Sequence, residues 1–380
     1  MSPDLSSSSA LLYIDHNAST PLCAAAREAI IAAMQWGYAN PSALHQPGRQ
    51  ARAMVELARE QVALAIAAKP EDIIFTSGGT ESLNHILFGV SAMHPGCAIA
   101  ISAVEHPAVS TPADDLQRRG HSLTRIPVND QGVVDVDAWQ PQADTRLLML
   151  MHANNETGAI QPVAAMSQRA HAHGALLGCD AAQSLGKIPV DVHSLDCDFL
   201  TIAGHKFGAP KGIGALWIRP GLTLPALIRG AGHERGLRAG SENVLLIAAL
   251  GAACADLQQR LQDMPRLQHM RDSIELHLQQ RQHAVVHAAR APRLPNTSLV
   301  ALPGMNAAAL LAHLPDVAAS TGSACHAGQH HASPTLQAMA VDTALAQSTL
   351  RLSLGPENSD DDGDVLLQRI EQALELHPCR

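Results

Sequence analysis

Hydrophobic positions alternate between short continuous runs and longer helical patterns over the first two thirds of the chain. Apolar runs typical of buried strands occur at residues 11–15, 73–76, 98–101, 147–151, 175–177, 199–202 and 215–218. Apolar residues at helical spacing occur at residues 22–36, 49–68, 81–93, 107–119 and 163–173. This alternation predicts an α/β fold with a mostly parallel sheet, in which ligands bind at the carboxyl ends of the strands.

The pattern changes near residue 242. Residues 242–282 form a long, polar-faced helical stretch that suits a bridge between domains. Beyond it, strand-like segments lie at residues 285–286, 297–302 and 349–353, and helices begin near residues 306 and 361. Fewer strands with interspersed helices predict a smaller α+β domain. The acidic run at 360–364 is interpreted as a helix N-terminus, which the helix dipole favours, rather than as a metal loop.

The composition is that of a globular protein, with 380 residues of which 46% are hydrophobic and 16% charged. This length suits two domains of unequal size. No apolar run approaches the roughly 18–20 residues that a membrane helix needs. Residues 1–9 lack the basic and apolar regions of a signal peptide. We therefore expect no membrane partner.

The net charge and the distribution of the cysteines narrow the possible binding partners and the cellular compartment. The net charge of −9 argues against nucleic-acid binding, since contacts to phosphates need a basic face. The seven cysteines form an odd, scattered set without a Cys-x-x-Cys pair. Such a set is typical of a reduced, cytoplasmic protein with one functional thiol.

Lysine is scarce in this chain. Its four lysines are Lys69, Lys187, Lys206 and Lys211. Because an arginine guanidinium stays protonated, only a lysine can form an imine at ordinary pH. Lys206 follows the apolar run 199–202, where burial would lower its pKa and free the amine as a nucleophile. The local stretch is equally consistent with a solvated loop lysine.

Other strand ends also carry polar groups. Ser77-Gly-Gly-Thr-Glu-Ser82 joins a strand to a helix, and it is either an ordinary capped turn or a phosphate cradle of free backbone N–H groups. Asp180 and His106 follow the runs 175–177 and 98–101. Together these groups offer an anion site, a partner for a protonated pyridine nitrogen, a stacking ring and an imine-forming amine. Pyridoxal phosphate requires this combination.

The same stretches resemble the pyridoxal-phosphate-dependent cysteine desulfurases, a family close to the selenocysteine lyases. The matching motifs are Ser77-Gly-Gly-Thr-Glu-Ser82, Glu105-His-Pro-Ala-Val109, Met151-His-Ala-Asn-Asn-Glu-Thr-Gly158, Asp180-Ala-Ala-Gln-Ser184, Gly204-His-Lys206, Pro210-Lys-Gly-Ile-Gly-Ala-Leu216, Gly232-His-Glu-Arg-Gly236, Gly322-Ser-Ala-Cys325 and Leu350-Arg-Leu-Ser-Leu-Gly355. The resemblance extends from about residue 12 to residue 376.

This resemblance implies membership of the class V aminotransferase superfamily and the fold of the type I pyridoxal-phosphate-dependent transferases. A large α/β domain with a mostly parallel seven-stranded sheet would comprise residues 13–260. Residues 1–12 and 261–380 would form a small α+β domain that carries Cys325. The resemblance also implies a homodimer.

The resemblance further implies a set of site residues. The cofactor-binding residues would be Gly79, Thr80, His106, Asn155, Asp180, Gln183, Ala203, Gly204, His205, Lys206 and, from the second subunit, Ser241. Lys206 would form the imine with the cofactor, Asp180 would pair with the pyridine nitrogen, and Gln183 would bond the phenolic oxygen. His106 would stack on the ring, and Gly79, Thr80, His205 and Ser241 would hold the phosphate. Asn155 and Arg351 would bind the substrate carboxylate.

One position departs from the family. Where the family usually has a serine before Gly-His-Lys, this chain has Ala203. The missing hydrogen bond to the phosphate costs on the order of 1.5–3 kcal/mol. We expect the remaining donors to hold the cofactor less tightly.

Cys325 is the second predicted reactive centre. It lies among small and polar residues in a stretch with the character of a mobile loop, where its thiol would be accessible. His326, His330 and His331 would favour the thiolate. A Cys-His-x3-His-His metal site is the weaker interpretation, since no further ligand set is visible, and we predict no metal.

The predicted activity is a cysteine desulfurase. L-cysteine would give L-alanine and a persulfide on Cys325, which an acceptor such as an iron–sulfur scaffold or a sulfur-carrier protein would take. Lys206, Cys325 and His106 would be the catalytic residues. The alternatives are a selenocysteine lyase, a non-catalytic partner-binding homologue, and a plain transaminase or β-lyase, which would leave the Cys325 stretch without a role.

Overall fold

The computed structural model describes residues 11–326 and 329–376, with the side chains of residues 323–332 and 376 outside that description. Its larger sheet has seven strands in the order β2-β8-β7-β6-β5-β3-β4. The strands are β2 Ile73–Thr76, β8 Gly214–Ile218, β7 Phe199–Ala203, β6 Leu176–Asp180, β5 Thr145–Met151, β3 Ala98–Ser102 and β4 Ser122–Ile126. Only β8 runs antiparallel to its neighbours in this sheet. The predicted mostly parallel, seven-stranded α/β sheet is therefore confirmed.

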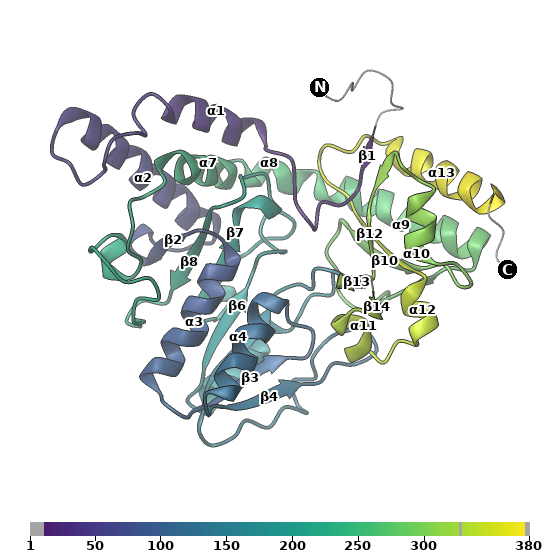
Figure 1. Ribbon diagram of the computed structural model, residues 1–380, viewed down its shortest axis with the longest axis horizontal. Helices are drawn as coiled ribbons and strands as arrows, with labels where there is room; N and C mark the ends of the chain where they lie inside the picture. The colour runs from purple at the N-terminus through teal and green to yellow at the C-terminus, as the bar shows by residue number, and fades with distance from the viewer. Residues whose placement is uncertain (1–10, 327–328, 377–380) are drawn as a thin grey trace.

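Helices cover both faces of this sheet (Figure 1). Helices α3 Gly79–Met93 and α4 Pro107–Arg118 pack on one face, and α2 Gln46–Ala65, α5 Val163–Ala172 and α7 Val244–Ala255 pack on the other. In β5, Leu147 and Met149 belong to the apolar cluster on the face covered by α3 and α4. Leu148 and Leu150 belong to the cluster on the opposite face, covered by α2, α5 and α7. Because both faces are buried, the strand has a continuous apolar run instead of an alternating one.

Several shorter elements complete this part of the chain. They are α1 Ala24–Ala33, α6 Val192–Leu195, α8 Leu257–Gln262 and the single-turn helices η1 Pro70–Asp72, η2 Gly204–Lys206 and η3 Glu234–Gly236. Helix α1 packs against α7. The turn η2 begins directly after β7, so it places Lys206 at the carboxyl edge of the sheet.

The C-terminal part contains a second, antiparallel sheet with the strand order β12-β15-β10-β9. Its strands are β12 Ser320–Thr321, β15 Thr349–Ser353, β10 Thr297–Ala301 and β9 Val285–Val286. The other elements here are α9 Met264–Gln282, α10 Ala307–Ala312, α11 Pro334–Ala338, α12 Thr343–Gln347, α13 Asp362–Leu376 and the hairpin strands β13 Ser323–His326 and β14 Gln329–Ala332. A separate apolar cluster lies between this sheet and helices α9 and α13.

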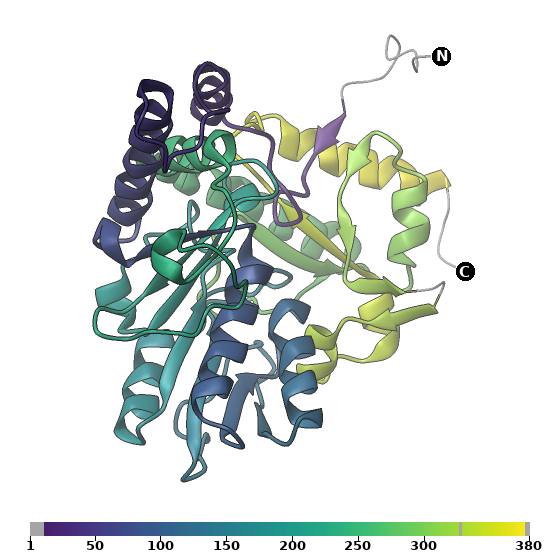
Figure 2. The same ribbon diagram turned by 60° about the vertical axis from the view of Figure 1, so that its left-hand side comes forward.

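The N-terminal strand joins this second part. β1 Leu12–Tyr13 pairs in parallel with β11 Val317–Ala318, and both Leu12 and Ile14 belong to the apolar cluster between the antiparallel sheet and helices α9 and α13. Figures 1 and 2 show this purple strand beside the green and yellow C-terminal elements. Strand β1 and the C-terminal elements therefore form one packed unit, although they are far apart in the sequence. The domain boundaries, 13–260 against 1–12 with 261–380, stay a prediction.

Two elements differ from the expectation. Residues 242–282 are three helices, α7, α8 and α9, because the chain breaks near Asp256 and Asp263, and Pro265 lies in the first turn of α9. A proline is tolerated there but not inside a helix. Helix α7 is also apolar on all sides instead of polar-faced, because it packs between α1 and α2.

The second difference concerns the Cys325 stretch, which was expected to be a loop. Its backbone forms an antiparallel hairpin in which Cys325 pairs with His330. The positions of the Cys325, His326, His330 and His331 side chains lie outside the described residues.

Within residues 11–326 and 329–376, no single helix is long and apolar enough to cross a membrane. Helix α7 together with Leu257–Gln282 would pass by length and composition, but the pair is bent by 43°.

Candidate active site

The predicted site residues meet in a cavity at the carboxyl edge of the large sheet. The cavity has a volume of about 170 Å³ and is bounded by the ends of β5, β6 and β7 and by the first turns of α3 and α4. Its lining includes Gly79, Thr80, His106, Asn155, Asp180, Gln183, Ala203, His205 and Lys206. Residues from five separate stretches of sequence are thus brought together, as the parallel topology requires.

The turn between β2 and α3 presents backbone N–H groups to this cavity. Gly78 has φ +148°, a conformation that side-chain-bearing residues rarely adopt, and α3 begins at the next residue. A Cβ on Gly79 would lie 3.3 Å from the Cβ of Ala203, so a side chain at this position would crowd the cavity. The first N–H groups of a helix have no acceptor within the helix. Those at Gly79 and Thr80 can therefore bind an anion.

The Glu81 side chain holds this turn in place. Its carboxylate accepts a hydrogen bond from the Ser77 backbone N–H at 2.8 Å and pairs with Arg238 at 3.0 Å. These contacts lower the pKa of Glu81 despite its partial burial. The carboxylate is thus engaged away from the anion site, and the segment that carries Arg238 is tied to the turn.

The amine of Lys206 enters the cavity from the single-turn helix η2. Nζ donates to the backbone oxygens of Asn17 at 2.8 Å and Ala18 at 3.0 Å. Burial, aided by the positive charge of Arg351, lowers the pKa of Lys206 to about 8. The amine is therefore far more nucleophilic near neutral pH than an ordinary lysine.

Asp180 ends β6 and is buried at the bottom of the cavity. Its Oδ1 accepts the Ala182 backbone N–H at 2.9 Å. Burial raises the pKa of Asp180, while the same N–H group, His106 and Lys206 oppose the rise. A buried carboxylate that faces a cavity is suited to a cationic group of a ligand.

His106 begins helix α4, and its ring is open to the cavity. Nδ1 accepts a hydrogen bond from the Ala108 backbone N–H at 3.1 Å, which fixes the orientation of the ring. The preceding residue, Glu105, is buried, and its Oε1 accepts bonds from Ser102 at 2.6 Å and from the Met151 N–H at 2.8 Å. Burial raises the pKa of Glu105 to about 8. The hydrogen bonds of Glu105 thus fix the backbone next to His106, whose ring can stack on a flat ligand.

A second cavity of about 230 Å³ adjoins the first and shares His106 and Asn155 with it. Arg351, for which carboxylate binding stays a prediction, lines this cavity. Its guanidinium donates to Asp15 at 2.8 Å and to Ser320 at 3.0 Å. Its buried Nε has no hydrogen-bond partner. Arg351 is thus oriented by Asp15 and retains a free donor.

The hairpin that carries Cys325 begins and ends at this second cavity. Gly322 and Ser333 both line the cavity, and the Ser333 N–H donates to the Gly322 oxygen at 3.3 Å. Cys325 lies three residues beyond Gly322 along β13. The backbone therefore connects the predicted nucleophile directly to the wall of the cavity.

Two of the predicted cofactor-binding residues do not line the first cavity. Gly204 is buried against Ala209 and Ile213, where a Cβ would lie 3.0 Å from the Ala209 Cβ. Ser241 is exposed on the segment before α7.

Three residues at the site were not predicted from the sequence: Asp15, Asn17 and Lys187. Asn17 bonds to both buried lysines, since its backbone oxygen accepts from Lys206 and its side-chain oxygen accepts from Lys187 at 2.7 Å. The sequence signal was slight, because Asp15 and Asn17 lie in or beside a short polar loop more than 150 residues from their partners. A lysine within an apolar stretch was the available clue for Lys187.

Comparisons with known proteins agree with this geometry. The family model described as "Aminotransferase class-V" matches residues 12–366. The chain belongs to the class-V aminotransferase family. The cysteine desulfurase IscS of Dictyoglomus turgidum is 38% identical over 96% of this chain and 94% of its own length. A cysteine desulfurase of Sinorhizobium fredii is 39% identical over 94% of this chain and 95% of its own.

A solved structure described as a NifS-like protein superimposes with a TM-score of 0.90. It is 32% identical in sequence and covers 96% of this chain and 100% of its own. The predicted type I transferase fold of this class-V aminotransferase is therefore confirmed.

The cofactor of this family is pyridoxal phosphate, and the site fits it. The N–H groups at the start of α3 suit a phosphate, the buried Asp180 carboxylate suits a protonated ring nitrogen, and Lys206 supplies the amine. Gln183 and His106 line the same cavity, where they can contact the ring.

Proposed function

We propose that this class-V aminotransferase is a cysteine desulfurase, which converts L-cysteine into L-alanine and passes the sulfur to an acceptor. The observation that carries the proposal is near-full-length similarity to proteins named cysteine desulfurases, at 38% and 39% identity, in a chain whose cavity contains Lys206. These relatives carry the desulfurase name, and no observation favours a selenocysteine lyase, a transaminase or a non-catalytic homologue.

Lys206 and Asp180 form the proton-handling pair of the proposed site. Pyridoxal phosphate, when bound, supplies an electron sink beside the substrate α-carbon. The Asp180 carboxylate would keep the ring nitrogen protonated, and His106 would stack on the ring. The Lys206 amine removes the α-proton of the substrate, for which a pKa of about 8 is well suited at neutral pH.

Arg351 and Asn155 orient the substrate. Both line the second cavity, and the Arg351 guanidinium is held by Asp15 and Ser320. A guanidinium binds a carboxylate through two parallel N–H bonds. Gly322 and Ser333, between which the Cys325 hairpin extends, line the same cavity as Arg351.

Cys325 accepts the sulfur. Its thiolate attacks the substrate sulfur, an S–S bond forms, and the C–S bond breaks with its electron pair left on carbon. The β-carbon takes up a proton, the α-carbon regains the proton that Lys206 removed, and L-alanine is complete, while Cys325 retains the sulfur as a persulfide. An acceptor thiol, on an iron–sulfur scaffold or a sulfur-carrier protein, then removes it.

We also propose that the enzyme is a cytoplasmic homodimer in which Ser241 of each subunit reaches the phosphate site of the other. Two observations support this arrangement. Ser241 is exposed, and large apolar side chains are exposed on or near helices α1 and α2, at Ile31, Met34, Tyr38, Leu57 and Leu64. The described cysteines are free thiols, which suits a reducing compartment.

The proposal is tested by incubating the purified protein with L-cysteine and measuring L-alanine. Replacing Cys325 with alanine is expected to reduce alanine formation to below about 1% of the parent rate, because the nucleophile is lost. The control is Cys23→Ser. This substitution changes another thiol, whose Sγ caps α1 by accepting from Ala26, and it should leave the rate unchanged. Full turnover by Cys325→Ala would exclude the persulfide step, and activity without bound pyridoxal phosphate would exclude the cofactor assignment.

A further inference from the structure

Lys187 is a second buried lysine near the cofactor cavity, and the proposed reaction does not use it. It lies in the turn after β6, and only 3% of its surface is exposed. Burial, reinforced by the positive charges of Lys206, Arg260 and Arg351, lowers its pKa well below the ordinary lysine value. Burying an amine is costly unless its hydrogen bonds are satisfied, so its contacts indicate why it is there.

Those contacts are two side-chain amides. Nζ of Lys187 donates to Asn17 Oδ1 at 2.7 Å and to Gln183 Oε1 at 2.5 Å. An amide group has an acceptor oxygen at one end and two N–H donors at the other. Because the amine donates to the oxygen end, the N–H end of Gln183 is directed away from Lys187.

One N–H of Gln183 is available to a ligand in the cavity. Nε2 donates to the Asn17 backbone oxygen at 2.9 Å, and this engages one of its two N–H bonds. Gln183 lines the cavity beside Asp180 and Lys206. The Asn17 backbone oxygen also accepts from Lys206 Nζ at 2.8 Å. A continuous set of hydrogen bonds therefore joins Lys187 to the cavity through Gln183 and Asn17.

We propose that Lys187 is a positioning residue that acts through Gln183. It holds the Gln183 amide so that its remaining N–H points into the cavity, toward an anionic oxygen on the cofactor ring. Without Lys187 the oxygen end of the amide loses its donor, and only the 2.9 Å bond from Nε2 to the Asn17 backbone oxygen still opposes a rotation that would present the amide oxygen to that anion. This inference rests on the cofactor binding proposed above and adds a residue that does not touch the cofactor.

The test measures the dissociation constant of pyridoxal phosphate and the visible absorption spectrum of the holoenzyme. Lys187→Met keeps the length of the side chain and removes the donor. It should raise the dissociation constant about three- to tenfold, the worth of one hydrogen bond, and shift the absorption maximum. The control Lys211→Met removes an exposed lysine of the loop after Lys206. It should change the constant by less than about twofold.

A double-mutant cycle shows whether Lys187 acts through Gln183. Gln183→Ala should weaken binding by a similar factor, and adding Lys187→Met to it should change the constant by less than about twofold. Fully additive effects would overturn the proposal. So would a Lys187→Met enzyme with the affinity and the spectrum of the parent.

Gln183→Glu provides an independent measurement in case Lys187→Met does not fold. This variant keeps an oxygen for Lys187 but replaces the cavity-facing N–H with a second acceptor. We expect cofactor binding at least about tenfold weaker, and parent affinity would overturn the proposal. A parent protein that does not bind pyridoxal phosphate would instead overturn the proposed function, so the two failures are distinguishable.

Discussion

The amine of Lys206 lies among groups of both charges, and their balance determines its reactivity. Burial and Arg351 lower the pKa of Lys206 to about 8, while Asp180 and Asp15 act in the opposite direction. At pH 8 about half of such amines are unprotonated, compared with less than about 1% of ordinary lysines. Only the unprotonated amine can attack an aldehyde.

This balance predicts the pH dependence of cofactor capture. Below pH 8 the amine is protonated and unreactive, so the rate at which the cofactor-free protein captures pyridoxal phosphate should rise with pH through a midpoint near 8. Stopped-flow absorbance measures this rate. Lys206→Arg, which keeps the charge but cannot form an imine, should show no covalent capture at any pH. A midpoint near 10 in the parent protein would contradict the burial argument.

Whether a site residue could be predicted from the sequence depended on its position relative to a strand of the large sheet. Lys206, Asp180 and His106 follow recognisable apolar strands, so their convergence at one edge could be predicted. Asn17 and Lys187 could not be found in the same way, because Asn17 follows the N-terminal strand, which lies outside the large sheet, and Lys187 lies beyond the end of β6 in a turn. Their importance follows from contacts made across 170 residues of sequence, between Asn17 and Lys187.

The segment between β8 and α7, residues 219–243, is the element that a buried ion pair holds in place. Arg59 of α2 makes two 2.8 Å bonds to Glu234, which also accepts the Phe75 N–H of β2 at 2.8 Å. The Arg59 guanidinium lies 4.7 Å from the centre of the Phe75 ring. Glu234 and Arg235 have φ values of 46° and 57°, which are strained for residues with side chains. The ion pair keeps this turn in its strained conformation.

Breaking this pair should destabilise the fold. Glu234→Gln leaves the buried Arg59 guanidinium with the partly exposed Glu56, 3.2 Å from its Nε, as its remaining carboxylate partner, and we expect the free energy of unfolding to fall by about 3–5 kcal/mol. Urea denaturation measures the change. The double variant Arg59→Met with Glu234→Leu should cost less than the sum of the two single changes, because no buried charge remains.

The control for this prediction is an exposed ion pair. Arg118 and Asp115 lie 3.2 Å apart on α4, and the Arg118 side chain is 69% exposed. Arg118→Met should change the free energy of unfolding by less than about 1 kcal/mol. Equal effects at the two sites would show that burial is not what makes the Arg59–Glu234 pair important.

The helix predicted over residues 242–282 shows the limit of pattern analysis for an element. Helical spacing continues through this stretch, but the chain turns near Asp256 and Asp263 so that α7 can pack between α1 and α2. The Cys325 stretch was expected to be a loop because its residues are small and polar. Backbone hydrogen bonds between β13 and β14 do not depend on apolar side chains, so the sequence pattern did not reveal them.

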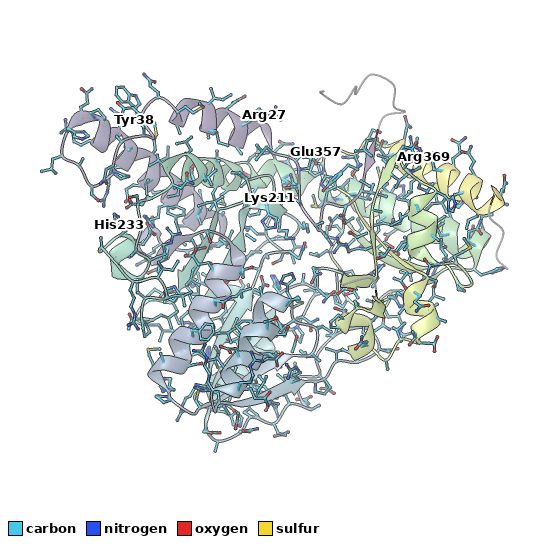
Figure 3. All side chains as sticks on the ribbon, in the orientation of Figure 1. Arg27, Tyr38, Lys211, His233, Glu357 and Arg369 are labelled. Carbon is cyan, nitrogen blue, oxygen red and sulfur yellow. The ribbon has the colours of Figure 1, made fainter. Side chains whose placement is uncertain are left out.

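At the scale of the whole molecule, one end carries features that suit a second subunit. Figure 3 shows Tyr38 and His233 at the end farthest from Arg369. Tyr38 is 75% exposed, and a cavity of about 930 Å³ nearby includes Arg59, His233 and Glu242. Ser241, the residue predicted to act in the other subunit, precedes Glu242. The proposed dimer would cover this end.

Mixed dimers test whether Ser241 acts across the interface. Pairing a Lys206→Ala chain with a Ser241→Ala chain leaves one site with Lys206, and that site receives an intact Ser241 from the partner. Its affinity for pyridoxal phosphate should equal that of the parent. Pairing a doubly substituted chain with a parent chain should weaken the remaining site about tenfold or more, since a hydrogen bond to a charged phosphate is lost.

Cofactor titration of affinity-purified mixed dimers distinguishes the two pairings. Equal affinities in both would contradict a role for Ser241 in the other subunit. A mass of one 40.1 kDa chain in solution would exclude the dimer itself.

The sequence by itself determined the α/β fold, the strands of the large sheet that continuous apolar runs mark, and the chemistry at their carboxyl ends. These features follow from local patterns, since buried strands must be apolar and ligand groups follow them. Only the tertiary structure decided that Asn17 and Lys187 orient Gln183, that Asp15 orients Arg351, and that Arg59 anchors residues 219–243. Each of these depends on contacts between distant segments, which local patterns do not record.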